Sequence, residues 1–117
     1  MVVARLPRTR QILRDRSGMN GTERAWSQEL EKLRLAGQLL WWRFEPFKLQ
    51  LGPGAFFTPD FALLWADGEL AFDEVKGHWR EAARVRIKVA AGLYPFFRFR
   101  VVVRGRKGEP AWKIEEI

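Results

Sequence analysis

Residues 56–79, FFTPDFALLWADGELAFDEVKGHW, contain two apolar runs separated by a short polar turn, a pattern that predicts a β-hairpin. Four charged residues stand where the ends of these strands should pack apolar side chains. Asp60 opens the first strand, and Asp73, Glu74 and Lys76 lie at the end of the second. Folding alone does not require this cluster, so we ask what purpose it serves.

The length of the turn decides which charged residues share a face of the hairpin. A loop of two residues would place Asp60 opposite Val75. A loop of three residues, 66–68, with its glycine in a left-handed bulge, places Asp60 opposite Glu74. We predict the second register, because Lys76 then shares a face with both carboxylates. The opposite face is lined by Phe61, Leu63 and Trp65, and Asp73 faces away from the cluster as a structural residue.

The rest of the chain predicts two helices and further strands around this hairpin. Trp26, Leu30 and Leu33 recur at helical spacing within 20–37, where Asn20 can cap the helix and Gly37 can end it. A second helix should follow Gly77 and stop at Pro95. We expect its apolar side to comprise Trp79, Ala82, Ala83, Val89, Ala90 and Leu93, with Arg80, Arg84 and Lys88 roughly opposite.

Extended segments are predicted on both sides of the hairpin. Residues 39–51 should form one or two strands broken at Pro46, residues 52–54 a loop, and residues 96–103 and 111–117 the last strands. The order of helix, strands, helix and strand predicts a small single-domain α/β fold, in which a central mixed sheet with a strand hairpin is flanked by helices. We assign residues 1–18 to a basic flexible arm and residues 19–117 to the folded domain.

Composition excludes several kinds of site. A chain of 117 residues has one modest core, and 47% hydrophobic residues indicate a globular protein. Without cysteine there are no disulfides, thiolate zinc sites or cysteine nucleophiles. His78 is the single histidine, which excludes a histidine-rich metal site. No signal peptide or transmembrane segment is evident, so we expect a cytoplasmic protein, in the host cytoplasm if a phage encodes it.

Charge is distributed unevenly along the chain. Residues 1–18 hold five arginines and one aspartate, and residues 79–107 hold nine basic residues and one glutamate, while the remainder is net acidic. Two basic segments therefore flank an acidic centre. Basic segments suit a polyanion, most commonly nucleic acid. The alternative is an ordinary solvated basic surface.

The acidic centre is best explained by a metal ion. Two carboxylates about 5 Å apart across a sheet repel each other unless a cation or a proton intervenes. Mg²⁺, or Mn²⁺ in its place, takes oxygen ligands and needs only one or two carboxylates besides water and phosphate. Lys76 can orient a water molecule and neutralise charge that develops on phosphorus. The pattern predicts metal-dependent hydrolysis of phosphodiester bonds.

The segments TPDF and DEVKG resemble the motif of the PD-(D/E)XK nucleases, and residues 19–103 resemble small phage-encoded and archaeal-type Holliday junction resolvases. The resemblance implies a restriction-endonuclease-like core in which Asp60, Glu74 and the Val75 carbonyl bind the metal. It further implies that Lys76 activates water, and that Glu23 on the first helix binds the metal directly or through water.

Three residues near this motif have a second interpretation. Glu23 could instead form a capping box with Asn20. Glu45-Pro46 resembles an acidic-Pro or Gln-Pro element of related phage nucleases, but an edge-strand carboxylate beside a strand-breaking proline would look the same. His78 fits the start of a helix better than a catalytic role.

We expect DNA to be the partner, without a membrane or a small-molecule cofactor. The predicted phosphate contacts are Arg8, Arg10, Arg80, Arg84, Arg86 and Lys88. Arg86 or Lys88 could approach the scissile phosphate or simply be solvated. With no domain for reading bases, recognition by shape is favoured, and a four-way junction would need a C2 homodimer for paired cuts. The aromatic residues in LLWW and YPFF could form the dimer face or ordinary core.

The alternative functions are a PD-(D/E)XK nuclease acting on linear, flapped or other DNA, and a basic DNA-binding module without catalysis. Cleavage of junction, flap and linear substrates would separate the first alternative. Metal-independent binding without cleavage would support the second.

Overall fold

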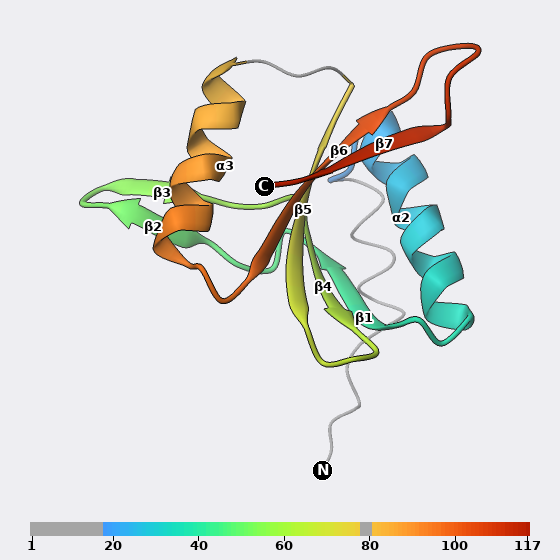
Figure 1. Ribbon diagram of the computed structural model, residues 1–117, viewed down its shortest axis with the longest axis horizontal. Helices are drawn as coiled ribbons and strands as arrows, with labels where there is room; N and C mark the ends of the chain where they lie inside the picture. Colours follow the sequence, from blue (N-terminus) through green and yellow to red (C-terminus); the bar gives the residue numbers. More distant parts are fainter. Residues whose placement is uncertain (1–17, 78–80) are drawn as a thin grey trace.

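The predicted hairpin lies at the centre of a five-stranded mixed sheet (Figure 1). The computed structural model describes residues 18–77 and 81–117. In spatial order the strands of the sheet are β1 (Leu39–Phe44), β4 (Phe61–Trp65), β5 (Leu70–Lys76), β6 (Arg98–Arg104) and β7 (Trp112–Glu116). Neighbouring strands are antiparallel except β5 and β6, which run parallel. The predicted mixed sheet is confirmed, and the chain folds as one α/β domain.

The turn between β4 and β5 has the three-residue form. Phe61 pairs with Asp73 and Leu64 with Leu70, which is the register that places Asp60 opposite Glu74. Gly68 has a φ of 92°, in the left-handed region where glycine is favoured. The prediction of this register is confirmed.

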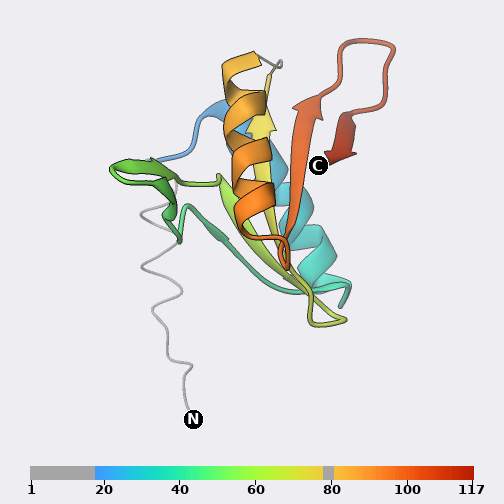
Figure 2. The ribbon, with the colours of Figure 1, turned by 60° about the vertical axis from the view of Figure 1, so that its left-hand side comes forward.

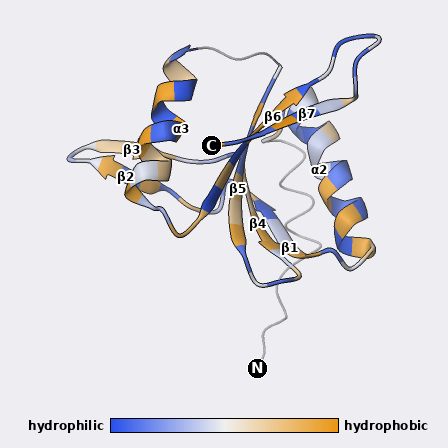
Figure 3. Cartoon of the chain, in the orientation of Figure 1, coloured by the Kyte–Doolittle hydropathy of each residue, from blue (hydrophilic) through white to orange (hydrophobic). Residues whose placement is uncertain are grey.

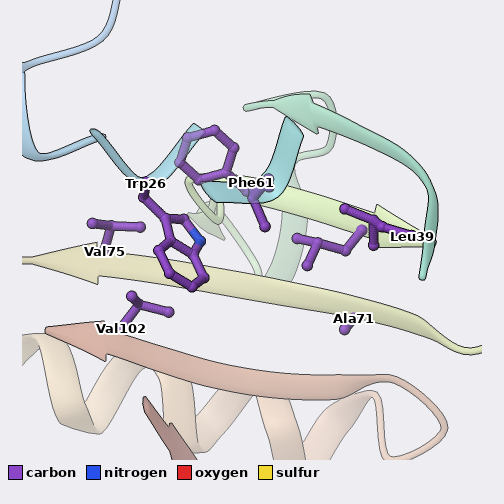
Figure 4. Close-up of a cluster of buried hydrophobic side chains, with 8 residues drawn as sticks. Trp26, Leu39, Phe61, Ala71, Val75 and Val102 are labelled. Atoms are coloured by element: carbon purple, nitrogen blue, oxygen red, sulfur yellow. The ribbon is translucent and has the colours of Figure 1, made fainter. Parts of the chain in front are cut away.

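Helix α2 (Gly21–Leu35) covers one face of the sheet and α3 (Glu81–Leu93) the other (Figure 2). Asn20 caps α2, and Gly37 follows the helix with a φ of 82°. Beneath α2 the buried side chains form one core cluster, consisting of Trp26, Leu30, Leu39, Phe61, Leu63, Ala71, Val75 and Val102 (Figure 4). The predicted helix and its inward stripe are therefore confirmed.

The inward face of α3 differs from the prediction. Ile87 and Ala90 are buried, whereas Ala82, Val89 and Leu93 are exposed. Apolar residues occupy a wide arc of this helix, interrupted by Arg86, so its sequence does not select one inward face within that arc. The packing of α3 against β6 and against a separate hairpin selects Ile87 and Ala90.

The predicted strand after Pro46 and the predicted loop at 52–54 are present, but the strand that follows the loop and its pairing into a separate hairpin were not predicted. Strands β2 (Leu49–Gly52) and β3 (Ala55–Phe57) pair with each other in a two-stranded sheet beside α3 (Figure 1). Leu49 and Phe57 are buried in the same cluster as Ile87. Between the strands Gly54 turns the chain with a φ of 72°.

Hydropathy follows this architecture. Figure 3 shows apolar residues along the central strands and polar residues on the outer turns of α2 and on the loop between β6 and β7. Within the two described ranges, neither helix is both long and apolar enough to span a bilayer.

Candidate active site

Asp60 and Glu74 face each other across the β4–β5 pair. Asp60 lies just before β4 and Glu74 lies within β5, and the two residues are only 7% and 5% exposed. The backbone N–H of Val75 donates to Asp60 Oδ2 at 2.8 Å. The backbone N–H of Asp60 donates to Glu74 Oε1 at 3.2 Å. The two carboxylates are thus held together by the hydrogen bonds of the strands that carry them.

Burial and mutual repulsion disfavour ionisation of this pair. Burial, and then the charge of Glu74, raise the pKa of Asp60 to about 8, although the N–H of Val75 opposes the shift. Burial also raises the pKa of Glu74, and the charge of Lys76 opposes this most strongly. A buried carboxylate pair of this kind requires a proton or a cation between the two groups. Its hard oxygen atoms fit a divalent cation such as Mg²⁺.

Lys76 and Arg86 bring positive charge to Glu74 from two elements. Lys76 Nζ lies 3.0 Å from Glu74 Oε2, and a third of the lysine side chain is exposed. Arg86, on α3, is exposed, and its charge also favours the ionised form of Glu74. The site therefore has one ammonium in contact and one guanidinium within electrostatic reach. Lys88, also predicted to bind DNA, is exposed on the same helix.

Glu23 forms the capping box that its sequence allowed. Its Oε1 accepts from the backbone N–H of Asn20 at 2.9 Å, and its own N–H donates to Asn20 Oδ1 at 2.8 Å. Its negative charge still reaches Asp60, where it contributes to the raised pKa. In the part of the chain that the structure describes, no three His, Cys, Asp or Glu side chains come close enough to hold a metal together.

Glu45 belongs to the same acidic surroundings, although sequence reasoning gave it less weight. Its N–H donates to the carbonyl of Asp60 at 2.8 Å, and its φ of 47° is left-handed. Burial and the charges of Glu23 and Glu74 raise the pKa of Glu45. The pairing of Phe44 with Phe61 places Glu45, the residue after β1, opposite Asp60.

Asp73 lies on the other face of the sheet, as the register predicts. Trp26 Nε1 donates to Asp73 Oδ2 at 2.9 Å, and Arg100 donates through Nε and Nη2, each at 2.8 Å. Asp73 is fully buried and Arg100 is 7% exposed. This network ties α2, β5 and β6 together and takes no part in the carboxylate pair.

Part of the positive charge of residues 79–107 is paired with carboxylates of the same chain. Arg84 is ion-paired with Glu115 at 3.3 Å, and Arg98 contacts both Glu69 and Glu116. Arg8, Arg10, Arg80 and His78 lie outside the described residues.

Comparisons with protein-family models, with curated proteins and with solved structures found no match for this chain.

Proposed function

We propose that this protein is a metal-dependent endodeoxyribonuclease of the PD-(D/E)XK type, with a restriction-endonuclease-like core. The observation that supports this most directly is the buried pair of Asp60 and Glu74 with Lys76 in contact with Glu74. A purely structural role would not require two like charges to be buried side by side.

The donor set suits Mg²⁺ or Mn²⁺. Asp60 and Glu74 would hold the ion, with the Val75 carbonyl as the further ligand that the resemblance implies. When bound, such an ion neutralises negative charge on a phosphodiester and lowers the pKa of a coordinated water. Glu23 and Glu45 add negative charge around this position, since they lie within electrostatic reach of Asp60 and Glu74.

The residues of the chain perform the remaining tasks. Lys76 favours the ionised form of Glu74, orients the attacking water and stabilises charge on the phosphate in the transition state. Arg86 contributes a second positive charge near Glu74. Because Arg86 is exposed on α3, it can contact DNA that lies against this helix.

We propose a four-way DNA junction as the substrate and a homodimer as the acting species, in the cytoplasm. The described domain has no separate element for reading bases, which favours recognition by backbone shape. Leu40 and Phe96, in the two aromatic segments, are 56% and 73% exposed, which supports a use for these segments beyond the core of one copy.

Cleavage of a four-way junction and of its matched linear duplex tests this proposal. Wild type, Asp60→Asn and Lys76→Ala would be assayed with Mg²⁺, Mn²⁺ or EDTA. Lys32→Ala is the control, because Lys32 is exposed in the last turn of α2, far from the capped end. We expect paired, metal-dependent nicks near the branch point with wild type and Lys32→Ala, and none with the other two variants.

Two other results would support one of the alternative functions instead. Equal cutting of junction and duplex would retain the nuclease but reject junction specificity. Binding of the junction without cleavage in either metal would favour the non-catalytic DNA-binding module.

A further inference from the structure

The loop between β6 and β7, residues 105–111, begins beside the candidate active site. Lys76 pairs with Val103 in the parallel β5–β6 ladder, and β6 ends one residue later at Arg104. The loop therefore leaves the sheet at the same end as the carboxylate pair, about one strand spacing of 4.8 Å from the strand that carries Lys76. Figure 1 shows it extending away from the sheet.

The loop is braced by its own hydrogen bonds. The N–H of Gly105 donates to the Ala111 carbonyl at 2.8 Å, and the N–H of Glu109 donates to the Arg106 carbonyl at 2.9 Å. Glu109 Oε1 accepts from the N–H of Arg106 at 2.8 Å. A Cβ on Gly105 would lie 1.7 Å from the Pro110 carbonyl oxygen, so this close return of the chain admits only glycine.

The tip of this loop carries more positive charge than Glu109, its one acidic residue, can balance. Residues 104–113 hold four basic residues and one acidic residue, Glu109, which pairs with Lys113 at 2.8 Å. Arg106 and Lys107 are exposed and form no ion pair with any described residue. Arg98 and Arg100, by contrast, are paired with carboxylates. Figure 3 shows the loop as a hydrophilic extension of the sheet.

We propose that this loop is a DNA-contacting arm, in which Arg106 and Lys107 bind backbone phosphates of the duplex that flanks the cut on the β6 side. The inference rests on the proposed nuclease function. Arg86 lies on α3, which covers the face of the sheet that carries Glu74 and Lys76, whereas the loop leaves the sheet beyond β6. Three extended residues beyond β6 reach about 10 Å, or roughly three base pairs along a duplex. Such contacts require DNA that is double-stranded on the β6 side of the scissile bond.

The salt dependence of DNA binding tests the arm. The affinity of a duplex and a four-way junction would be measured in EDTA from 50 to 200 mM salt, with wild type and the double variant Arg106→Gln, Lys107→Gln. The matched control is Lys32→Gln, Arg34→Gln, which removes two ion-paired charges from the last turn of α2. Loss of two phosphate contacts should lower the slope of log K against log salt by about 1.8 and weaken binding about 10- to 60-fold near 0.1 M salt. The control should retain the wild-type slope.

Footprinting places the contact. On DNA bound by wild type, hydroxyl-radical protection should extend to both sides of the nick, and the arm variant should lose protection on one side only. The proposed role of the loop would be rejected by an unchanged salt slope in the arm variant or by a slope change that the control shares. It would also be rejected by a loss of protection that is equal on both sides of the nick. If wild type binds DNA but never cuts it, the comparison of salt slopes between wild type and the arm variant still tests whether the loop contacts DNA. Only the nuclease assignment then fails. If wild type binds no DNA, both proposals fail.

Discussion

Asp60 and Glu74 each accept a hydrogen bond from the strand of the other. Val75 N–H donates to Asp60 at 2.8 Å, and Asp60 N–H donates to Glu74 at 3.2 Å. These bonds hold both carboxylates in place despite their repulsion, because moving either one would leave a buried backbone N–H without a partner. The pair therefore costs stability when both members are ionised and no cation is present.

The first prediction is that the metal-free protein loses stability as pH rises from about 4 to 8. The pKa of Asp60 is about 8 in the folded state and 3.8 as its ordinary value, so over this range the folded state binds a proton that the unfolded state releases. The free energy of unfolding should fall by up to about 1.4 kcal/mol per pH unit. Urea unfolding in EDTA at pH 5, 6.5 and 8 measures this.

Asp60→Asn is the matched variant, because asparagine still offers an oxygen to Val75 N–H without titrating. It should flatten the pH profile and be more stable than wild type at pH 8. A wild-type profile as flat as that of the variant would contradict the raised pKa.

The second prediction concerns Lys76, whose ammonium lies 3.0 Å from Glu74 Oε2. Lys76→Ala should lower kcat on DNA by about 10²- to 10⁴-fold, because the transition state loses an adjacent positive charge. Equilibrium binding of DNA should change less than about threefold. Lys32→Ala removes an exposed lysine from the last turn of α2 and should leave kcat unchanged. Equal loss of binding and turnover would assign Lys76 to DNA binding rather than to chemistry.

The third prediction separates the two interpretations of Glu23. Glu23→Gln keeps an oxygen for the Asn20 N–H and removes the charge, whereas Asn20→Ala removes the other half of the cap and leaves the charge. Asn20→Ala should cost about 1 kcal/mol of stability with little change in kcat. If Glu23 assists the metal, Glu23→Gln should instead raise the Mg²⁺ concentration needed for half-maximal cleavage. Thermal unfolding and a Mg²⁺ titration measure the two effects, and an unchanged Mg²⁺ requirement would leave Glu23 as a cap only.

The fourth prediction concerns the buried network on the other face. Asp73→Asn leaves the Arg100 guanidinium buried without its counter-ion and should cost about 3–5 kcal/mol. Trp26→Phe removes one hydrogen bond to Asp73 and some packing area, and should cost about 1–3 kcal/mol. Urea unfolding measures both. Normal stability of Asp73→Asn would mean that the ion pair is dispensable to the fold.

Local rules predicted the parts of this structure that depend on neighbouring residues. The three-residue turn and the alternation of side chains along a strand were enough to place Asp60 opposite Glu74 and Asp73 on the other face. The capping box of Glu23 also followed from a spacing of three residues. In each case the geometry of one turn of the chain determines the contact.

The missed features depend on contacts between distant segments. The inward face of α3 was misassigned because Val89 and Leu93 are as apolar as Ile87, and only packing against β2, β3 and β6 distinguishes them. The approach of Glu45 to Asp60 requires knowledge that β1 pairs with β4. Likewise, the neutralisation of Arg100 by Asp73 requires the parallel pairing of β5 with β6.

The turn between β4 and β5 also restricts how this protein can change during evolution. Asp73 and Glu74 are adjacent in the chain but lie on opposite faces, one in a structural network and the other in the candidate active site. A deletion or insertion that slid β5 by one residue would turn each of them to the other face. One slide would place Asp73 opposite Asp60 and Phe72 beside Trp26, and the other would place Glu74 beside Trp26 and Val75 opposite Asp60, so neither would preserve both sites. Among descendants of this chain, length changes at residues 66–68 should therefore survive only where the pairing of Phe61 with Asp73 is preserved.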